Sequence, residues 1–420
     1  MAQYIITPEA PVCGTVAISG SKNAALPILA AGLLCEEDSV FTNVPEVSDI
    51  SHMCALLLSM GASCVSDADR VRVSLPASSR KKTAPLELVS RLRASFLIMG
   101  PLLARCGRVR LPLPGGCQIG ARPIDLHLKG FSAMGARIRQ GHGYVEAVCD
   151  RLQGASIYLD FPSVGATENL MLAACLADGE TVIENAAAEP EIADLAGCLS
   201  AMGAEITGAG SDTIHIIGKT QLSPCHYRII PDRIETGTFL TLAAASHGDL
   251  TLTGATPSHS KPVLAKLEEM GFFIEAGEDM LHISPCERFK SVDIKTLPHP
   301  GFPTDMQVQL LALATIAKGT SVVVENVFEN RFTHAGDLNR MGANVRVSGR
   351  TAVVKGVPKL FGAHVAARDL RGGAALAIAA LAAEGETVIE HAELIDRGYE
   401  QLEEMLCALG ADAGRICQST

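Results

Sequence analysis

The sequence contains no Trp, and aromatic residues make up only 4% of its 420 positions. Charged residues are also scarce, at 19%, against 48% hydrophobic residues and 39 glycines. A chain this long with so little charge can bury a large core, which excludes intrinsic disorder and favours two or three domains. Because aromatic side chains are few, we expect a core of Ala, Leu, Ile and Val, with close backbone contacts at glycine.

An excess of positive charge is missing as well. The formal net charge is −11, whereas nucleic-acid binding needs a basic surface, so we expect no nucleic-acid partner. The longest apolar run, residues 374–383, is about half of what a bilayer-spanning helix needs, and no secretory signal is visible, so we expect no membrane association. Thirteen dispersed cysteines without a CxxC pair argue against a zinc site and favour a reduced, cytoplasmic location.

Motifs of common cofactor chemistry are also absent. Gly218–Lys219–Thr220 is not a phosphate loop, because Thr213 stands where the first glycine is needed. Ser163 lacks the glycine that precedes the serine of a nucleophile elbow, and neither HExxH nor GxGxxG occurs. We therefore expect no metal and no cofactor, and disfavour nucleotide hydrolysis, zinc hydrolysis and nicotinamide chemistry.

An internal repeat organises the chain. An apolar segment ending in Met-Gly or Leu-Gly, usually followed by Ala, recurs six times at intervals of roughly 70 residues. The marker glycines are Gly61, Gly135, Gly203, Gly271, Gly342 and Gly410. Six copies at so even a spacing are not expected by chance.

Each copy also contains an Ala/Leu-rich helix and a β-branched strand, as in residues 168–186, 305–327 and 375–392. These helices are apolar around almost the whole circumference, which predicts that they are buried. The marker glycine suits the left-handed end of a second helix, so one repeat is predicted to be helix–strand–helix–strand–strand. Three repeats per domain predict an α/β fold of two near-equal domains, with buried helices, outer sheets and a midpoint near residues 227–231. A single extended repeat array is the alternative.

Polar residues interrupt the apolar pattern where the buried helices start. Ser163, Thr304 and Asp369 suit N-caps, which satisfy the first N–H groups of a helix. Cations also stand at or near helix starts, where the helix dipole disfavours positive charge by a few tenths to about 1 kcal/mol. These cations are Lys22, Arg93, Arg233 and Arg371. Their equivalent positions in the repeats indicate that several helix ends converge, between the two domains, on an anionic ligand.

The second repeat is longer than the others between Gly107 and Gly135. The extra residues lie in 111–127, where prolines and glycines predict a hinge-capable loop that carries Cys117 and, shortly after it, Arg122. A cysteine on such a loop near basic residues is prone to form the thiolate, which makes Cys117 a candidate acid or nucleophile. The alternative is a small structural residue, as we expect for most of the other twelve cysteines.

With these segments in view, the chain resembles the enolpyruvyl transferases, and among them the branch that acts on UDP-N-acetylglucosamine. The resemblance covers essentially the whole chain. The segments that carry it are GSKNAALP (20–27), LPGGCQIGARPIDLH (113–127), SVGATEN (163–169), NAAAEPEI (185–192), FPTDMQ (302–307), FENRF (328–332), DLRGGAAL (369–376) and DRGYEQLE (396–403).

The resemblance implies a two-domain inside-out α/β barrel of six repeats, three per domain. It assigns residues 22–230 to an N-terminal domain and residues 1–21 with 231–420 to a C-terminal domain. The implied reaction transfers the enolpyruvyl group of phosphoenolpyruvate to the 3′-hydroxyl of UDP-N-acetylglucosamine by addition, then elimination of phosphate. This is the first committed step of peptidoglycan synthesis, and the implied partners are these two substrates.

Residue roles follow from the same resemblance. Cys117 is expected to protonate the methylene carbon and to form a covalent adduct, while Asp305 takes the hydroxyl proton; Asp369 matches a position near the intermediate. The phosphoenolpyruvate site is expected to contain Lys22, Asn23, Arg122, Arg331, Arg371 and Arg397, with Lys22, Arg122 and Arg397 on the phosphate. The UDP-sugar site is expected to contain Asn23, Arg93, Arg122, Pro123, Ile124, Asp125, Leu126, Ser163, Val164, Gly165, Asp305 and Val327.

Plainer interpretations stay open for several of these residues. Asp305 could be a helix cap. Arg331 and Arg397 could be surface ion-pair residues, and Glu189 and Glu191 could be solvated loop carboxylates.

The chain also departs from the family pattern. Ser48 and Phe161 stand where family members often carry Lys, and Leu97 lies near a frequent Trp, so contacts to phosphate or diphosphate are expected to be weaker. The nearest rival is the branch that acts on shikimate phosphate, which has Arg where this chain has Ala24–Ala25 and lacks the cysteine loop. A catalytically silent repeat scaffold that binds a UDP-sugar is the rival from another class.

Overall fold

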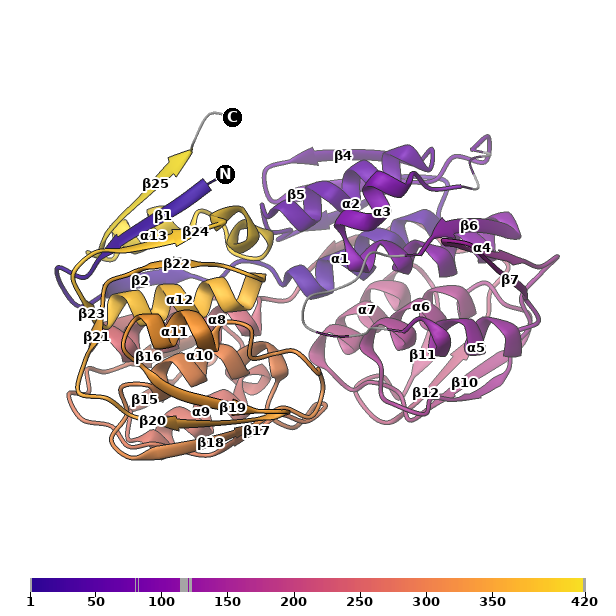
Figure 1. Ribbon diagram of the computed structural model, residues 1–420. Coiled ribbons are helices and arrows are strands. Elements are labelled where there is room, and N and C mark those ends of the chain that lie inside the picture. Colours follow the sequence, from indigo (N-terminus) through magenta and orange to yellow (C-terminus); the bar gives the residue numbers. More distant parts are fainter. Residues whose placement is uncertain (1, 80, 82, 114–119, 121–122, 418–420) are drawn as a thin grey trace. The chain divides into compact units, whose positions relative to one another are not determined.

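The computed structural model describes residues 2–79, 81, 83–113, 120 and 123–417. Its internal contacts divide the chain into two compact units (Figure 1). We call the unit built from residues 1–19 and 231–420 the C-terminal unit, and the unit built mostly from residues 20–230 the N-terminal unit, each over its described residues. Each unit has a hydrophobic core of its own, made mainly of Ala, Leu, Ile and Val. The chain is therefore not one extended repeat array.

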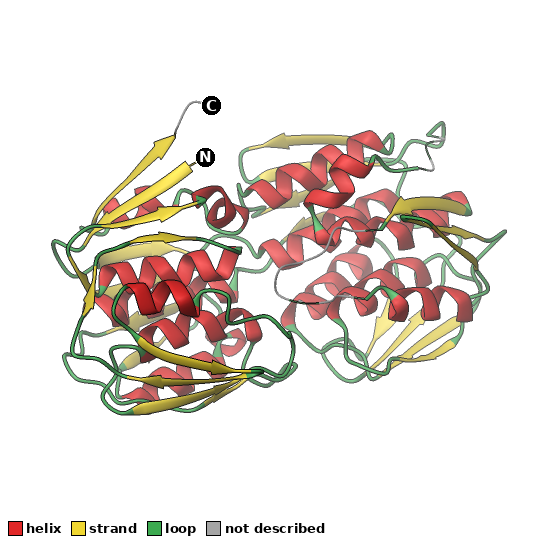
Figure 2. Ribbon diagram, viewed as in Figure 1, coloured by secondary structure: helices red, strands yellow, loops and turns green. Residues whose placement is uncertain are grey.

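Three buried helices form the centre of each unit, with strands at its periphery (Figure 2). They are α1 (Lys22–Ala31), α4 (Met99–Cys106) and α6 (Val164–Ala174) in the N-terminal unit, and α8 (Arg233–Ser246), α10 (Thr304–Ala314) and α12 (Leu370–Leu381) in the C-terminal unit. From its third residue onward, every residue of α6, α10 and α12 is buried, which confirms the predicted buried helices. In the C-terminal unit α8, α10 and α12 all pack against one another.

Outer helices and short helical turns complete the helical part. The outer helices are α2 (Ser48–Ser59), α5 (Asp125–Ala133), α7 (Pro190–Ala201), α9 (Lys261–Met270), α11 (Ala335–Arg340) and α13 (Leu402–Ala408), with the short α3 (Leu86–Arg91). The 3₁₀ turns are η1 (Gly32–Leu34), η2 (Arg93–Ile98), η3 (Pro257–His259) and η4 (Ala392–Arg397).

One repeat of the N-terminal unit shows the shared plan. Strand β9 (Ser156–Tyr158) runs parallel to β10 (Glu180–Glu184), and α6 connects them. Helix α7 then leads to the hairpin of β11 (Glu205–Thr207) and β12 (Thr213–Ile217), which closes the sheet in the order β11-β12-β10-β9. The predicted order helix–strand–helix–strand–strand is thus confirmed.

The remaining sheets repeat this plan with small variations. In the N-terminal unit they are β13-β3-β5-β4 and β6-β8-β7, with β3 (Ser39–Thr42), β4 (Ser63–Asp67), β5 (Arg70–Ser74), β6 (Arg108–Pro112), β7 (Arg137–Gly141), β8 (Tyr144–Val148) and β13 (His226–Arg228). In the C-terminal unit they are β15-β16-β14-β2, β17-β18-β20-β19 and β22-β24-β1-β25, with the small pair β21-β23. Their strands are β1 (Ala2–Thr7), β2 (Cys13–Ala17), β14 (Asp249–Thr253), β15 (Ile274–Ala276), β16 (Met280–Ile283), β17 (Ile294–Lys295), β18 (Thr320–Val324), β19 (Asn344–Ser348), β20 (Thr351–Lys355), β21 (Leu360–Phe361), β22 (His364–Ala366), β23 (Ala383–Glu384), β24 (Thr387–Glu390) and β25 (Asp412–Cys417).

The six marker glycines all adopt a positive φ, from 88° at Gly61 to 112° at Gly271. Each lies at or just beyond the end of a helix, where a left-handed residue stops the helix and glycine alone adopts the conformation without strain. The predicted helix ends are confirmed.

Strand β1 completes a sheet made from the far end of the chain. It pairs antiparallel with β24 on one side and with β25 on the other. Its alternating burial places Ala2, Tyr4 and Ile6 toward the core. No helix among the described residues is long and apolar enough to cross a membrane.

Candidate active site

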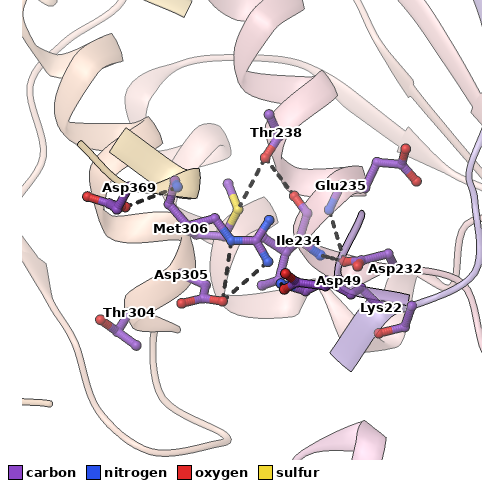
Figure 3. A network of polar contacts seen from close by, with 12 residues as sticks. Lys22, Asp49, Asp232, Ile234, Glu235, Thr238, Thr304, Asp305, Met306 and Asp369 are labelled. Atoms are coloured by element: carbon purple, nitrogen blue, oxygen red, sulfur yellow. Dashed lines mark hydrogen bonds and ion pairs between the residues drawn. The ribbon is translucent and has the colours of Figure 1, made fainter. Parts of the chain in front are cut away.

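Asp305, in the first turn of α10, accepts hydrogen bonds from two buried arginines, Arg331 and Arg371. Figure 3 shows Asp305 beside Thr304 and Met306. Arg331 Nη2 donates to Oδ1 at 2.8 Å, and Arg371 donates to Oδ2 through Nε at 3.4 Å and Nη2 at 3.3 Å. The side chain of Asp305 is 26% exposed, against 2% for Arg331 and 4% for Arg371. The carboxylate is therefore the most accessible member of this ion cluster.

Arg371 is the second residue of α12, so the predicted cation at this helix start is confirmed. Its Nη1 donates to the hydroxyl of Tyr399 at 3.1 Å. Burial alone would lower the pKa of Arg371, but the interactions with Tyr399 and Asp305 raise it above its ordinary value. These two partners thus hold a charged guanidinium at a helix end whose dipole opposes positive charge.

Arg331 is buried, so its interpretation as a surface ion-pair residue is wrong. Its Nη2 also lies 3.4 Å from the carbonyl oxygen of Thr304, and its guanidinium lies 5.7 Å from the ring centre of Phe328. Its Nε is buried and has no hydrogen-bond partner among the described residues. Buried donors are nearly always paired, so this N–H group is suited to an acceptor that a ligand supplies.

Glu325, fully buried after β18, ties the loop that carries Val327 to the start of α10. Its Oε1 accepts from Thr296 Oγ1 and from the backbone N–H groups of Val327 and Phe328, and its Oε2 accepts from Thr304 Oγ1 at 2.9 Å. The prediction that Thr304 caps α10 is therefore wrong. The N-cap position belongs to Pro303, which also makes Asp305 a first-turn residue and not the cap.

Asp369 is the N-cap of α12, as predicted. Its Oδ1 accepts from the backbone N–H groups of Arg371 and Gly372, and its Oδ2 accepts from Thr333 Oγ1 at 3.1 Å. Arg397 is the last residue of η4 and is half-buried. Within the C-terminal unit the structure therefore brings Asp305, Arg331 and Arg371 into direct contact. Asp369 is hydrogen-bonded to the backbone N–H group of Arg371.

In the N-terminal unit Lys22 is the first residue of α1, and Ser21 caps that helix. Lys22 Nζ lies 3.1 Å from Asp49 Oδ2, and both side chains are buried. Half-buried Asn23 follows in the same turn. The chain's own carboxylates, Asp49 here and Asp305 in the other unit, thus supply part of the negative charge that the sequence analysis assigned wholly to a ligand.

His127 joins several segments of the predicted UDP-sugar site. Asn169 Nδ2, which also donates to the carbonyl of Phe96, lies 3.1 Å from His127 Nδ1. Since an amide nitrogen only donates, Nδ1 accepts and the ring proton belongs on Nε2. Burial, helped by the positive charge of Arg93, lowers the pKa of His127 to about 3. A Cβ added at Gly165 would lie 3.6 Å from the ring, so α6 begins against this neutral histidine.

The other predicted UDP-sugar residues lie around these elements. Ser163 is the N-cap of α6, as predicted, and half-buried Val164 follows it. Ile124 is the N-cap of α5, with exposed Pro123 before it and Asp125 and Leu126 in the first turn. Cys117 and Arg122 lie outside the described residues. The convergence of helix ends from both units on one ligand stays a prediction.

Two further expectations need correction. Glu191 is only 2% exposed, so its interpretation as a solvated loop carboxylate is wrong. It lies in α7 near Glu168, whose pKa is raised by burial and then by the charges of Glu191 and Glu189. Of the twelve described cysteines only six are buried, and Cys13, Cys407 and Cys417 are exposed.

Sequence reasoning missed Glu325, Tyr399, His127 and Asn169. Three of them stand inside motifs quoted for the resemblance, but next to residues of more obvious chemistry. A signal was present for Asn169, because it is an amide inside an otherwise apolar buried helix. Glu325 comes directly after β-branched residues, as Glu184 does in another repeat. The two differ in burial, which the sequence does not show, because Glu325 is buried and Glu184 is exposed.

The chain is similar to known proteins over nearly its full length. It matches the family described as EPSP synthase (3-phosphoshikimate 1-carboxyvinyltransferase) over residues 6–406. It is 52% identical to UDP-N-acetylglucosamine 1-carboxyvinyltransferase 1 of Caldanaerobacter subterraneus subsp. tengcongensis, over 97% of this chain and 98% of that protein. It is also 52% identical to UDP-N-acetylglucosamine 1-carboxyvinyltransferase 2 of Carboxydothermus hydrogenoformans, over 99% and 100%.

Solved structures show the same fold. The enolpyruvyl transferase NikO from Streptomyces tendae superposes with a TM-score of 0.89 at 25% identity, over 99% of this chain and 98% of that one. EPSP synthase from Acinetobacter baumannii superposes with a TM-score of 0.76 at 18% identity, over 99% and 100%. The predicted two-domain α/β architecture is thus confirmed.

Proposed function

Because the chain belongs to the EPSP synthase family of 1-carboxyvinyltransferases, we propose that it transfers the enolpyruvyl group of phosphoenolpyruvate to the 3′-hydroxyl of UDP-N-acetylglucosamine, with release of phosphate. The observation that carries the proposal is the ion cluster at the start of α10. There an accessible carboxylate, Asp305, lies between two buried guanidinium groups, and one of them keeps a buried N–H group available for an acceptor.

The reaction requires two proton transfers in its addition step. The sugar hydroxyl loses its proton while its oxygen bonds to the central carbon of phosphoenolpyruvate, and the methylene carbon gains a proton. In the elimination step the new methyl group loses a proton and the bond from carbon to the phosphate oxygen breaks. A well-placed proton-transfer group is worth about 10²–10⁴ in rate.

Asp305 is assigned the hydroxyl proton. It is 26% exposed, and both of its oxygens accept hydrogen bonds from arginines, which hold the carboxylate in one orientation. The buried N–H group of Arg331, with Arg371, is assigned to the carboxylate of phosphoenolpyruvate, because guanidinium groups pair well with carboxylates. Cys117 is assigned the proton of the methylene carbon on the basis of the resemblance alone.

The remaining contacts are assigned to the N-terminal unit, together with Arg397 of the C-terminal unit. Lys22, with Arg122 and Arg397, is proposed to hold the phosphate, and Asn23 to lie at both substrates. The starts of η2, α5 and α6 around His127 are proposed to hold the UDP-sugar, because N-terminal helix ends offer N–H groups to anions. We also propose that residues 22–230, and residues 1–21 with 231–420, act as two domains that close on the substrates, in a cytoplasmic enzyme.

One assay with two acceptors tests the proposal. The protein is incubated with phosphoenolpyruvate and either UDP-N-acetylglucosamine or shikimate 3-phosphate, and released phosphate is measured. We expect release with the UDP-sugar and none with shikimate phosphate. Release only with shikimate phosphate would assign the protein to the rival branch, and no release with either would leave the catalytically silent scaffold.

A substitution tests the loop cysteine separately. Cys117→Ser should lower turnover by at least about 10²-fold, because a hydroxyl is a far weaker acid than a thiol. Unchanged turnover would remove Cys117 from the proton transfer and leave the acceptor assignment intact.

A further inference from the structure

The hydroxyl of Tyr399 is a meeting point of the three buried helices of the C-terminal unit. It lies 3.1 Å from Arg371 Nη1 of α12, 2.9 Å from Thr238 Oγ1 of α8 and 3.5 Å from Gln309 Nε2 of α10. Tyr399 itself is 2% exposed, and Thr238 and Gln309 are fully buried. A buried phenol usually finds one hydrogen-bond partner, whereas this one has a partner on each of the three helices.

The direction of these hydrogen bonds follows from what each group can donate. The single proton of Thr238 is used at the carbonyl oxygen of Ile234, 2.8 Å away (Figure 3). The side-chain nitrogens of Arg371 and Gln309 only donate. The phenol of Tyr399 therefore donates to Thr238 and accepts from Arg371. A continuous chain of hydrogen bonds runs from the guanidinium of Arg371 through two hydroxyl groups to the backbone of α8.

This chain fixes the plane of a guanidinium group whose other contacts are long. The two bonds from Arg371 to Asp305 measure 3.3 Å and 3.4 Å, whereas Arg331 reaches the same carboxylate at 2.8 Å. Tyr399 holds the third nitrogen, and a planar group held at both edges cannot turn. Without the phenol oxygen, a buried Nη1 loses its partner and the guanidinium is free to reorient.

We infer that Tyr399 is a positioning residue, which sets Arg371 for the carboxylate of phosphoenolpyruvate without touching the substrate itself. The inference rests on the proposed function, which assigns that carboxylate to Arg371 and Arg331. It separates two parts of the site, because the hydrogen-bond chain from Tyr399 reaches Arg371 directly and reaches a residue assigned to the UDP-sugar only one step further on, at Asp305.

Tyr399→Phe tests the inference, since it removes one oxygen and keeps the packed ring. We expect the KM for phosphoenolpyruvate to rise about tenfold or more, because a lost hydrogen bond to a charged group is worth at least that factor. The KM for UDP-N-acetylglucosamine should stay within about twofold. Tyr227→Phe is the matched control: it loses the hydrogen bond from a half-buried tyrosine hydroxyl to Asp194 at 2.8 Å in the N-terminal unit. It should lower Tm and leave both KM values unchanged.

Thr238→Val provides a second variant of similar shape that breaks the same chain one step further from Arg371. We expect a smaller rise in the KM for phosphoenolpyruvate, about threefold, because the phenol still accepts from Arg371. If Tyr399→Phe does not fold, Thr238→Val still tests whether the hydrogen-bond chain affects the KM for phosphoenolpyruvate. In an active protein, an unchanged KM for phosphoenolpyruvate, or an equal rise in both KM values, would overturn the inference alone. No phosphate release by the unaltered protein would overturn the proposed function, and this inference with it.

Discussion

The two units share one repeat plan but use the starts of their buried helices differently. In the C-terminal unit Asp305 lies between the charged groups of Arg331 and Arg371. In the N-terminal unit the start of α6 lies against His127 of the outer helix α5, which burial keeps neutral and which Asn169 orients. The same scaffold thus supports an ionic cluster in one unit and a neutral hydrogen-bond network in the other, which is why the residues at the helix starts, and not the fold, decide the chemistry.

Accessibility divides the charged pairs in the same way. The side chain of Asp49, which pairs with Lys22, is 3% exposed, whereas that of Asp305 is 26% exposed. Both carboxylates balance a cation at a helix start, but only Asp305 is open enough to exchange a proton with a substrate. The cations Lys22 and Arg371 thus stand at equivalent helix starts, but their carboxylate partners differ in accessibility.

The largest expected effect is that of Asp305→Asn, which removes the base from the ionic cluster but keeps its shape. We expect kcat to fall by about 10²–10⁴-fold, measured as phosphate release. Asp337→Asn is the control, because Asp337 also pairs with two arginines, Arg340 and Arg368, and is buried. It should lower Tm and leave kcat unchanged; equal losses of kcat in both variants would show that any broken arginine pair disables the protein.

The pair of Lys22 and Asp49 is expected to show a smaller effect with two separable parts. Lys22→Met should lower the free energy of unfolding by about 3 kcal/mol, because it removes one partner of a buried ion pair. Adding Asp49→Asn should recover most of that loss in urea unfolding. The KM for phosphoenolpyruvate should stay raised about tenfold in both variants, since the phosphate contact is lost in both; recovery of this KM in the double variant would contradict the role of Lys22.

Glu235 contrasts with Asp305, because it is a buried carboxyl group of the C-terminal unit that stays neutral. Burial, then the charge of Asp232, raises its pKa to about 8, and its Oε2 accepts from the N–H group of Ser19 at 2.8 Å. Between the ordinary pKa of 4.5 and this value the folded state holds a proton that the unfolded state has lost, so the folded state is destabilised as pH rises. Glu235→Gln keeps the acceptor and should stabilise the protein by about 3 kcal/mol at pH 7 and by nothing at pH 4.

Urea unfolding at both pH values measures this difference. Glu384→Gln is the control, because Glu384 is exposed and pairs with Lys359 at the surface. It should leave the unfolding free energy nearly unchanged at either pH. A gain from Glu235→Gln that is equal at pH 4 and pH 7 would contradict the protonated state of Glu235.

The smallest expected effect tests the neutral network of the N-terminal unit. The folded pKa of His127, about 3, lies below its ordinary value of 6.5, so the unfolded state binds more protons between these values and stability falls as pH falls. At pH 5 this costs about 2 kcal/mol relative to neutral pH. The variant His127→Gln lacks this pH dependence. Its free energy of unfolding should therefore lie below that of the unaltered protein by about 2 kcal/mol less at pH 5 than at pH 7. A stability difference between His127→Gln and the unaltered protein that is the same at pH 7 and pH 5 would contradict a buried, neutral ring.

The sequence predicted what depends on near neighbours in the chain. The apolar pattern of α6, α10 and α12 and the glycines that end the outer helices specify local conformation, and both predictions are confirmed. Ser163 and Asp369 cap their helices for the same local reason. The resemblance to the enolpyruvyl transferases supplied the site residues, and the structure shows three of them, Asp305, Arg331 and Arg371, in direct contact.

The sequence did not predict the polar partners that act through distant contacts. Tyr399 is hydrogen-bonded to Thr238, 161 residues away in the sequence, and to Gln309, 90 residues away. No local sequence pattern predicts contacts between residues so far apart. Thr304 fails as a cap because Glu325, 21 residues further on, takes its hydroxyl group. Buried polar networks depend on the final packing, whereas caps and turns depend on the chain alone.

The position of β1 between β24 and β25 has a consequence for synthesis on the ribosome. Once synthesised, β1 must wait for its partner strands at residues 387–390 and 412–417. At elongation rates of 5–20 residues per second that delay is roughly 20–80 seconds. During it, a segment with two open hydrogen-bonding edges is present while the N-terminal unit is already complete. In nascent chains on crowded polysomes, β1 is therefore a segment that is open to aggregation and that a chaperone would protect.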